Sequence, residues 1–135
     1  MRKHPRMLAE AGIDKWRYAE LRAVCRQYPE ARRRLENARL GIVDRRPGRG
    51  AWHRPDPVGN AAAMIADMPE ARTVRLIEEC AAAVAESAVA PGIIESVAYG
   101  LPYDKLRRRP PCGHNQFNRA RARFYMELHR RLLER

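Results

Sequence analysis

Leu101-Pro-Tyr-Asp-Lys-Leu106 opens the stretch of sequence that decides the fold, and Arg107-Arg-Arg-Pro-Pro-Cys-Gly113 and His114-Asn-Gln-Phe-Asn-Arg-Ala-Arg-Ala-Arg-Phe124 follow it directly. The first stretch is a short segment anchored by apolar residues, the second is a break, and the third begins a long helix. That helix carries His, Asn, Gln and Arg in its first turns beside an aromatic stripe. This order predicts a helix-turn-helix at about residues 101–134, an arrangement that places a helix in the major groove of DNA.

The last predicted helix, about residues 113–134, has one apolar side. Its apolar residues recur at spacings of three and four, as on one face of an α-helix: Phe117, Ala120, Phe124, Leu128 and Leu132. Five other residues fall away from this stripe: Asn115, Asn118, Arg119, Ala122 and Arg123. Small and polar residues there allow close approach to base edges, where Asn pairs with adenine and Arg with guanine. The alternative is an amphipathic surface helix with a solvated arginine face.

The charge of the chain agrees with a polyanionic partner. The net charge is +11 and the isoelectric point is about 10.6, which by itself favours DNA, RNA and acidic membranes equally. The basic excess lies at the two ends: residues 1–54 hold 15 basic and 6 acidic side chains, residues 55–106 hold 3 and 8, and residues 107–135 hold 9 and 2. We therefore interpret the acidic middle of the chain, residues 55–106, as a structural segment.

The N-terminal part, residues 1–40, reads as a basic helical segment. Asp14 is a candidate N-cap, and apolar residues at helical spacing follow it up to Gly41, which is expected to end the helix. Pro29 interrupts the pattern, so residues 14–40 form either one kinked helix or two abutting ones. We expect Trp16 to anchor the core and Trp52 to make a linker or interface contact.

The remainder predicts an all-α protein with a linker. Residues 41–60 hold four Gly and three Pro and are assigned as a linker, and 61–135 as a helical DNA-binding domain. Residues 58–68 and 70–89 are Ala-rich and helical, and 93–98 form a short helix ended by Gly100. No run of alternating β-branched residues is present.

The stretch from Ile93 to Leu133 resembles region four of bacterial sigma factors as it recurs in small phage regulators. The shared pattern is a helix ending at Tyr99-Gly100, a short helix over Tyr103–Leu106, a turn and a recognition helix. Pro111-Cys112-Gly113-x-x-x-Phe117 is similar to phage late-gene activators of the RinA and ArpU type. So are three elements further upstream: Leu21-Arg22, Tyr28-Pro29, and Asp56-Pro57 with Ala61. In contrast to the sigma pattern, Pro102 and Gly113 stand where hydroxyl caps are usual.

The resemblance implies a sequence-specific transcriptional regulator of phage or prophage late-gene type. Its partners would be double-stranded DNA and RNA polymerase, in the cytoplasm of a bacterial host. Four residues would read bases: Asn115, Gln116, Asn118 and Arg119. Six would contact phosphates: Arg107, Arg108, Arg109, His114, Arg121 and Arg123.

Metal-binding and enzymatic interpretations have weaker signals. Cys112 and His114 could supply two metal ligands with Cys80 or His53, but zinc sites need two paired clusters at fixed spacing. Cys112 more simply anchors the turn to the core. Glu78, Glu79 and Asp104 could serve a nuclease, yet the sequence holds no nucleophile elbow, phosphate loop or HExxH motif. We therefore expect no enzyme activity, metal or cofactor.

An assembly protein is the second hypothesis. The Ala-rich helix over residues 70–89 could form a homodimer interface, and a small phage DNA-packaging subunit, like the small terminase subunit, would combine such a helix with a helix-turn-helix. RNA binding is the third. Three cysteines without CxxC spacing suit a reducing compartment, and no apolar run is long enough to span a bilayer, so a cytoplasmic protein without membrane contact is expected.

Overall fold

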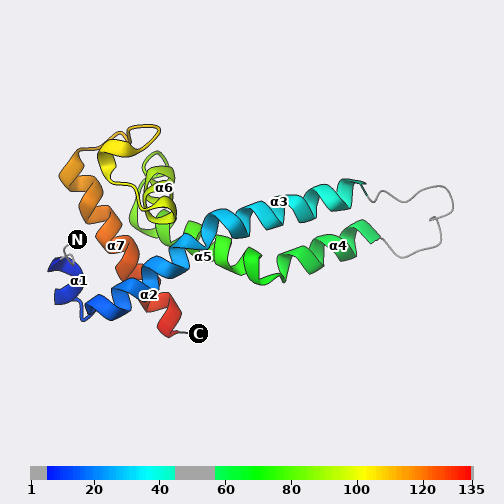
Figure 1. Ribbon diagram of the computed structural model, residues 1–135, viewed down its shortest axis with the longest axis horizontal. Coiled ribbons are helices and arrows are strands. Elements are labelled where there is room, and N and C mark those ends of the chain that lie inside the picture. The colour runs from blue at the N-terminus through cyan, green and yellow to red at the C-terminus, as the bar shows by residue number, and fades with distance from the viewer. Residues whose placement is uncertain (1–5, 45–56, 135) are drawn as a thin grey trace.

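The computed structural model describes residues 6–44 and 57–134, and the regular structure in these two ranges is entirely helical. The predicted all-α class is confirmed. A bundle built from α1, α2, α5, α6 and α7 contains the core, and a pair of antiparallel helices, α3 and α4, extends away from it (Figure 1).

The N-terminal helices are α1 (Arg6–Glu10), α2 (Lys15–Arg26) and α3 (Tyr28–Asp44). Asp14 caps α2 as predicted: its carboxylate accepts a hydrogen bond from the backbone N–H of Arg17 at 2.7 Å. The chain breaks into two abutting helices at Gln27, because Pro29 has no N–H to continue the α2 ladder and instead lies in the first turn of α3.

Two predictions for this part are wrong. Gly41 does not end the helix, since α3 continues to Asp44; a helical glycine costs only about 1 kcal/mol, and α3 packs along α4. Trp16 does not anchor the core, because it is 71% exposed. The core positions of α2 are instead Leu21 and Cys25, both fully buried. The predicted linker is helical at both margins, and the rest of it, with Trp52 and His53, lies outside the described residues.

The middle of the chain forms α4 (Pro57–Ala66), α5 (Pro69–Val84) and α6 (Ala90–Tyr99). The expected helices over 58–68 and 70–89 are present, but α5 ends at Val84, where Ala85 adopts an extended conformation before the turn that leads to α6. Gly100 ends α6 as predicted, with a left-handed φ of 68° that glycine adopts without strain.

Helix α7 (His114–Leu133) lies against α5, α6, α1 and α2. The predicted stripe is confirmed: Phe117, Ala120, Phe124 and Leu128 are buried, and Leu132 packs at its edge. The outward position predicted for Ala122 is wrong, since it is 7% exposed. Tyr125 is buried beside it and meets Tyr18 of α2 edge to face, so α7 is covered on more than one side.

The connection between α6 and α7 is not a helix followed by a short turn. The short helix expected over Tyr103–Leu106 is present only as a single 3-10 turn, η1 (Tyr103–Lys105), between Gly100 and Gly113. Pro110 and Pro111 lack the N–H groups that a longer helix requires. The connection is packed instead, with the Tyr103 hydroxyl donating to the carbonyl of Cys112 at 2.7 Å and Pro110 buried against Gly92.

We predict that Phe117→Ala and Phe124→Ala each lower the free energy of unfolding by about 3 to 5 kcal/mol, because each removes a fully buried ring from a packed core. Chemical denaturation followed by circular dichroism measures this loss. Trp16→Ala, which removes an exposed ring, serves as the control and should change stability by less than about 0.5 kcal/mol. Unchanged stability in either phenylalanine variant would contradict this account of the core.

Candidate nucleic-acid interface

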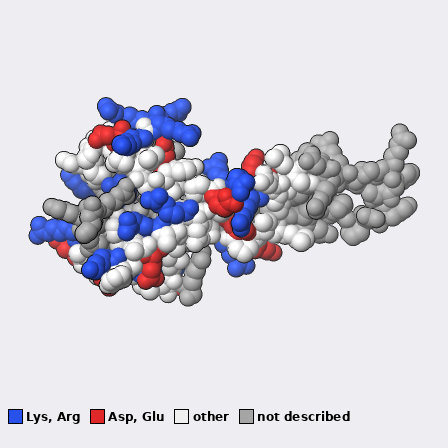
Figure 2. All heavy atoms as spheres, viewed as in Figure 1, with Lys and Arg blue, Asp and Glu red and all other residues white. Residues whose placement is uncertain are grey.

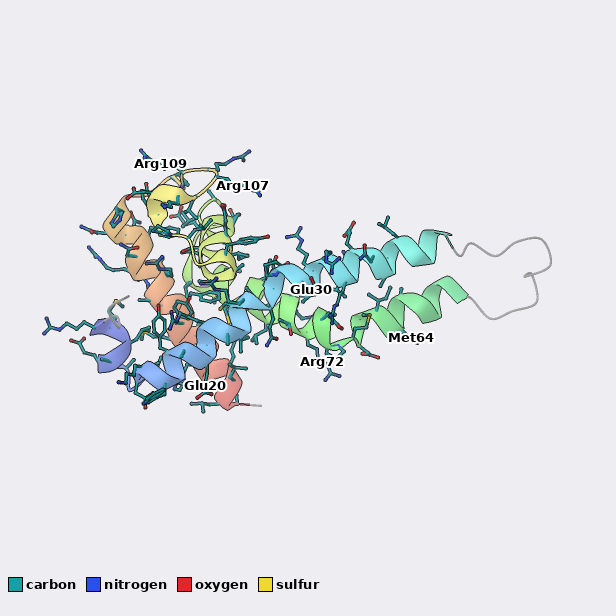
Figure 3. All side chains as sticks on the ribbon, viewed as in Figure 1. Glu20, Glu30, Met64, Arg72, Arg107 and Arg109 are labelled. Carbon is teal, nitrogen blue, oxygen red and sulfur yellow. The ribbon has the colours of Figure 1, made fainter. Side chains whose placement is uncertain are left out.

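The residues predicted to contact DNA lie mainly at one end of the molecule. Arg107, Arg108 and Arg109 are exposed on the connection after η1, and Figure 3 shows Arg107 and Arg109 projecting there, far from Glu20 and Arg72. The first turn of α7 begins at His114, next to this connection. The fold therefore brings the arginine run and the start of α7 together.

The arginine connection is fixed by its backbone rather than by its guanidinium groups. The backbone N–H of Arg107 donates to the Glu95 carboxylate of α6 at 3.0 Å. The Tyr103 ring lies 5.4 Å from the Phe117 ring, and the Arg109 guanidinium lies 5.9 Å from the centre of the Tyr103 ring. The side chains thus project from an anchored backbone. Glu95 and Tyr103 had no functional signal in the sequence, because their role depends on the packing of α6 against η1.

The N-terminus of α7 is open. Gly113 is its N-cap, in an extended conformation (φ −78°, ψ 164°) and without a side-chain cap. No described atom lies within 4 Å of the position that a Cβ would take there. The N–H groups of a first helical turn and the positive end of the helix dipole favour anions, and here three arginines precede them. This end of the helix is suited to a phosphate group.

Four predicted contact residues share the exposed side of α7. Gln116, Arg119 and Arg123 recur at spacings of three and four residues, and Asn115 is adjacent. The other sides of the helix face the core, α1 and α2. An exposed polar surface flanked by positive charge is what a groove-reading helix requires.

Three other predicted residues form a hydrogen-bonded chain. Arg121 is half-buried, and it donates to the hydroxyl of Ser96 at 2.9 Å and to Oδ1 of Asn118 at 3.1 Å. Asn118 Nδ2 lies 3.1 Å from Nδ1 of His114. The structure does not bring Arg121 to the open surface with Arg119 and Arg123, so its guanidinium fits the predicted phosphate contact poorly.

Carboxylates bind some of the arginines elsewhere in the described residues. Glu30 accepts from Arg33 and Arg34 on α3, and Glu127 accepts from Arg130 and Arg131 on α7. By contrast, no ion pair within the described ranges joins a carboxylate to the exposed arginines of the connection or of the α7 surface: Arg107, Arg108, Arg109, Arg119 and Arg123. Figure 2 shows basic atoms gathered over the connection. We call these five residues the unpaired arginines.

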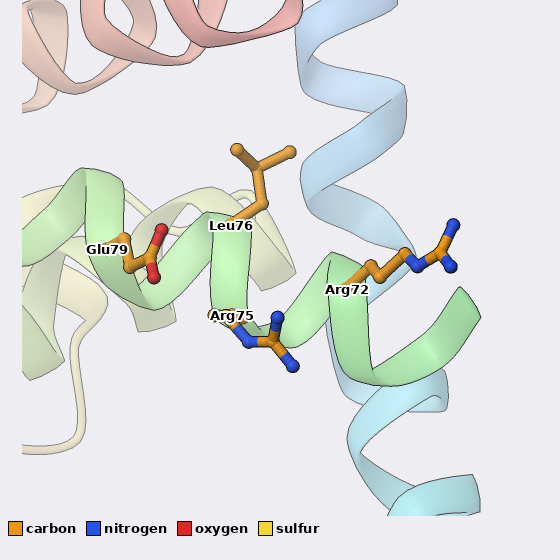
Figure 4. Close-up of a pocket in the computed structure, with 4 residues that line it drawn as sticks. All are labelled: Arg72, Arg75, Leu76 and Glu79. Carbon is orange, nitrogen blue, oxygen red and sulfur yellow. The ribbon is translucent and has the colours of Figure 1, made fainter. Parts of the chain in front are cut away.

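A basic hollow lies on α5 and is less suited to a polyanion than the surface of the unpaired arginines. Arg72, Arg75, Leu76 and Glu79 line it (Figure 4). Arg75 donates to the carbonyl of Ala66, and Glu79 accepts from Arg131 at 3.0 Å. The negative Glu79 and these internal bonds reduce the positive potential that the hollow offers to a ligand.

The cysteines and the Ala-rich helix occupy the interior. Burial raises the pKa of the Cys80 thiol to about 11 and raises that of Cys25 further, so both are protonated at neutral pH. No group of three or more potential metal ligands occurs within residues 6–44 and 57–134. The apolar face of α5 is covered by α3, α6 and α7, and the exposed side of the helix carries charged residues such as Arg72, Arg75 and Glu79 beside Ala82 and Ala83.

The chain matches no protein-family model, no curated protein and no solved structure. Among the described helices, none has the length and apolar character that crossing a bilayer requires.

The ion pairs of Glu127 with Arg130 and Arg131 should make the stability of the protein depend on pH. Hydrogen bonds from Arg130 and then Arg131 hold the pKa of the Glu127 carboxyl below its usual range. A carboxyl whose pKa is lowered by folding adds stability above its unfolded pKa of about 4.3 and loses that contribution as the pH falls through the folded pKa. We therefore expect Glu127→Gln to be less stable than the wild type at pH 7.

The stability gap between Glu127→Gln and the wild type should shrink as the pH is lowered below about 4.3. It should vanish once the pH lies below the lowered pKa of folded Glu127, where the carboxyl is protonated in both the folded and the unfolded chain. Urea unfolding at pH 7 and pH 3 measures it. Glu20→Gln, which removes an exposed carboxylate paired only with Arg17 among the described residues, is the control and should show a smaller gap at pH 7. A gap of equal size at both pH values for Glu127→Gln would contradict the assignment.

Proposed function

We propose that the protein is a sequence-specific, double-stranded DNA-binding regulator of transcription that reads the major groove with the N-terminal half of α7. The observation that carries this proposal is the segregation of the unpaired arginines. They lie on the connection that precedes α7 and on the exposed side of its N-terminal half, whereas Arg33, Arg34, Arg130 and Arg131 are held by carboxylates. The major groove, about 12 Å wide, admits one α-helix. The exposed side of α7 that carries Gln116, Arg119 and Arg123 could face the bases in it.

The proposed interface has two kinds of contact, one with phosphates and one with bases. Arg107, Arg108 and Arg109 on the connection, with the N–H groups of the first turn, would bind phosphates and set affinity and orientation. Asn115, Gln116 and Arg119 would present amide and guanidinium groups to base edges, and Arg119 has the donor geometry for guanine. Arg123, one turn further along, would contact the backbone of the duplex.

The regulatory role is supported by the sequence resemblance to phage late-gene activators, which also suggests RNA polymerase as a partner in a bacterial cytoplasm. In this proposal α6 precedes the reading helix, and the packed connection with η1 replaces the short scanning helix. No step requires a metal, a cofactor or a catalytic group.

Selection of random DNA fragments by the purified full-length protein, followed by sequencing, tests the proposal directly. An enriched sequence would support regulation. Uniform recovery of fragments would overturn it in favour of a packaging or other assembly role, and preferential capture of RNA from a matched pool would overturn it in favour of RNA binding.

We predict a steep salt dependence. If about six phosphates are engaged, the plot of log binding constant against log salt concentration should have a slope near −5. Arg107→Gln/Arg108→Gln should reduce the magnitude of that slope by about 2, because each lost phosphate contact removes about 0.9. Fluorescence anisotropy titrations from low to moderate salt measure it.

Arg33→Gln/Arg34→Gln is the matched control for this pair. It removes the same net charge, but from side chains that are already bound to Glu30. Its slope should equal that of the wild type. Equal changes in both double variants would show that total charge, rather than the unpaired arginines, determines binding.

Arg119→Ala should cost about 1 to 3 kcal/mol on the enriched sequence and little on random DNA, because a base contact acts only on its cognate base. Arg130→Ala, at the far end of the same helix and paired with Glu127, should change neither. Competition titrations with both DNAs supply the two affinities. Parallel losses on both DNAs would make Arg119 a backbone contact instead.

A further inference from the structure

A chain of hydrogen bonds connects the core to the exposed start of α7. Its members are Leu101 O, Ser96, Arg121, Asn118 and His114. The buried hydroxyl of Ser96 donates to the carbonyl of Leu101 at 2.6 Å. That hydroxyl accepts from Arg121 at 2.9 Å, and Arg121 also donates to Asn118 Oδ1. Asn118 Nδ2 then meets His114 Nδ1 at 3.1 Å.

The chemistry of these groups gives each bond one direction. A guanidinium only donates, so the oxygen of the Asn118 amide must face Arg121. Its nitrogen, which only donates, then faces His114. Because the Ser96 proton is used on Leu101, its lone pairs are left to accept from Arg121. The amide orientation of Asn118 is thus determined from the core outward.

The position of Arg121 supports an internal role. Its guanidinium lies 6.0 Å from the centre of the Phe117 ring, which is fully buried, and its side chain is only partly exposed. Neither bonded partner is a carboxylate, so its charge is not neutralised by an ion pair. Holding a long, charged side chain against an aromatic ring and two polar partners fixes its geometry.

A fixed amide suits base reading. An amide has two lone pairs and two N–H groups, so after these bonds Asn118 keeps one of each. A bidentate contact with adenine needs one acceptor and one donor from the same amide. Ordering a mobile side chain on binding costs affinity, and an amide that is already ordered avoids this cost.

We infer that Arg121 and Ser96 are positioning residues, which hold the Asn118 amide in the orientation that contacts a base, and that Arg121 does not bind phosphate. This inference rests on the proposed DNA-binding function. It deepens that function by separating Arg121 from the neighbouring Arg119 and Arg123.

Two variants of the full-length protein test the inference. Arg121→Lys keeps the charge but cannot reproduce the fork that joins Ser96 and Asn118. Ser96→Ala removes the buried anchor, which DNA cannot touch. Arg123→Lys is the matched control for the relaxation measurement, which needs no DNA, since it makes the same chemical change at an exposed position two residues away. Thermal melting accompanies each variant.

The first readout is nuclear relaxation of the Asn118 side-chain amide, which needs no DNA. The amide should be ordered in the wild type and in Arg123→Lys, and mobile in Arg121→Lys and Ser96→Ala. An amide equally ordered in all four proteins would overturn the positioning role, whether or not the protein binds DNA.

The second readout is the affinity for the fragment enriched by the wild-type protein, divided by that for a random duplex. Arg121→Lys and Ser96→Ala should lower this ratio by about tenfold, in the range of one good base contact, with an unchanged affinity for the random duplex. If Arg121 binds phosphate, Arg121→Lys should change both affinities alike and Ser96→Ala neither, which would overturn the inference. Parallel loss of both affinities with a lowered melting temperature would likewise assign the residues to stability alone.

Absence of any enriched fragment would refute the proposed function, while the relaxation measurement would still decide whether Arg121 and Ser96 order Asn118.

Discussion

The burial of Phe117 is the interaction on which the rest of the structure depends. Its ring is fully buried and lies 5.4 Å from the Tyr103 ring of η1. It also packs so close to Gly92 of α6 that a Cβ added at this glycine would lie 3.4 Å from Cε2 of Phe117. The Arg121 guanidinium lies above the same ring. One aromatic side chain therefore joins α7, the arginine connection and α6. Because Phe117 stands in the first turns of α7, the packing that stabilises the core also sets the position of the exposed residues beside it.

Net charge alone does not identify the candidate interface. Basic side chains are abundant on α3 and at the end of α7, but there Glu30 binds Arg33 and Arg34, and Glu127 binds Arg130 and Arg131, at spacings of three and four residues. Such exposed pairs contribute little stability, yet they cancel local potential. Two carboxylates stand at these spacings from the arginines at 107–109, 119 and 123: Asp104, before Arg107 and Arg108, and Glu127, four residues after Arg123. Among the described residues Asp104 forms no ion pair with them, and Glu127 bonds to Arg130 and Arg131 instead. Within the described residues, the exposed arginines of the connection and of α7 are thus left without an ion pair.

The sequence predicted what local chemistry determines. Asp14 begins α2 by the hydrogen bond that its side chain accepts, and Gly100 ends α6 by its left-handed conformation. The apolar stripe that contains Phe117 follows from the period of the α-helix. The sequence failed where tertiary contacts decide. Trp16 is apolar but projects outward, while Ala122 is small and buried because α7 is covered on a second side. The packed connection with η1 depends on the Tyr103–Cys112 bond and on Pro110 against Gly92, which no spacing rule contains. The DNA-binding role itself stays a prediction.

Residues 119, 121 and 123 show why residue type does not determine role. All three are arginines and contribute equally to net charge. Successive residues of a helix are rotated by about 100°, so residues two apart point to nearly opposite sides, and residues four apart return to the same side. Arg119 and Arg123 therefore share the exposed surface, whereas Arg121 turns toward Ser96 on α6. The same helical phase that exposes two of these arginines to solvent turns the third inward, where it donates to Ser96 and Asn118. Under the proposed function, both kinds of arginine are needed. Exposed arginines attract the duplex but do not orient a neighbouring amide, whereas the half-buried Arg121 orients Asn118 without contacting DNA itself.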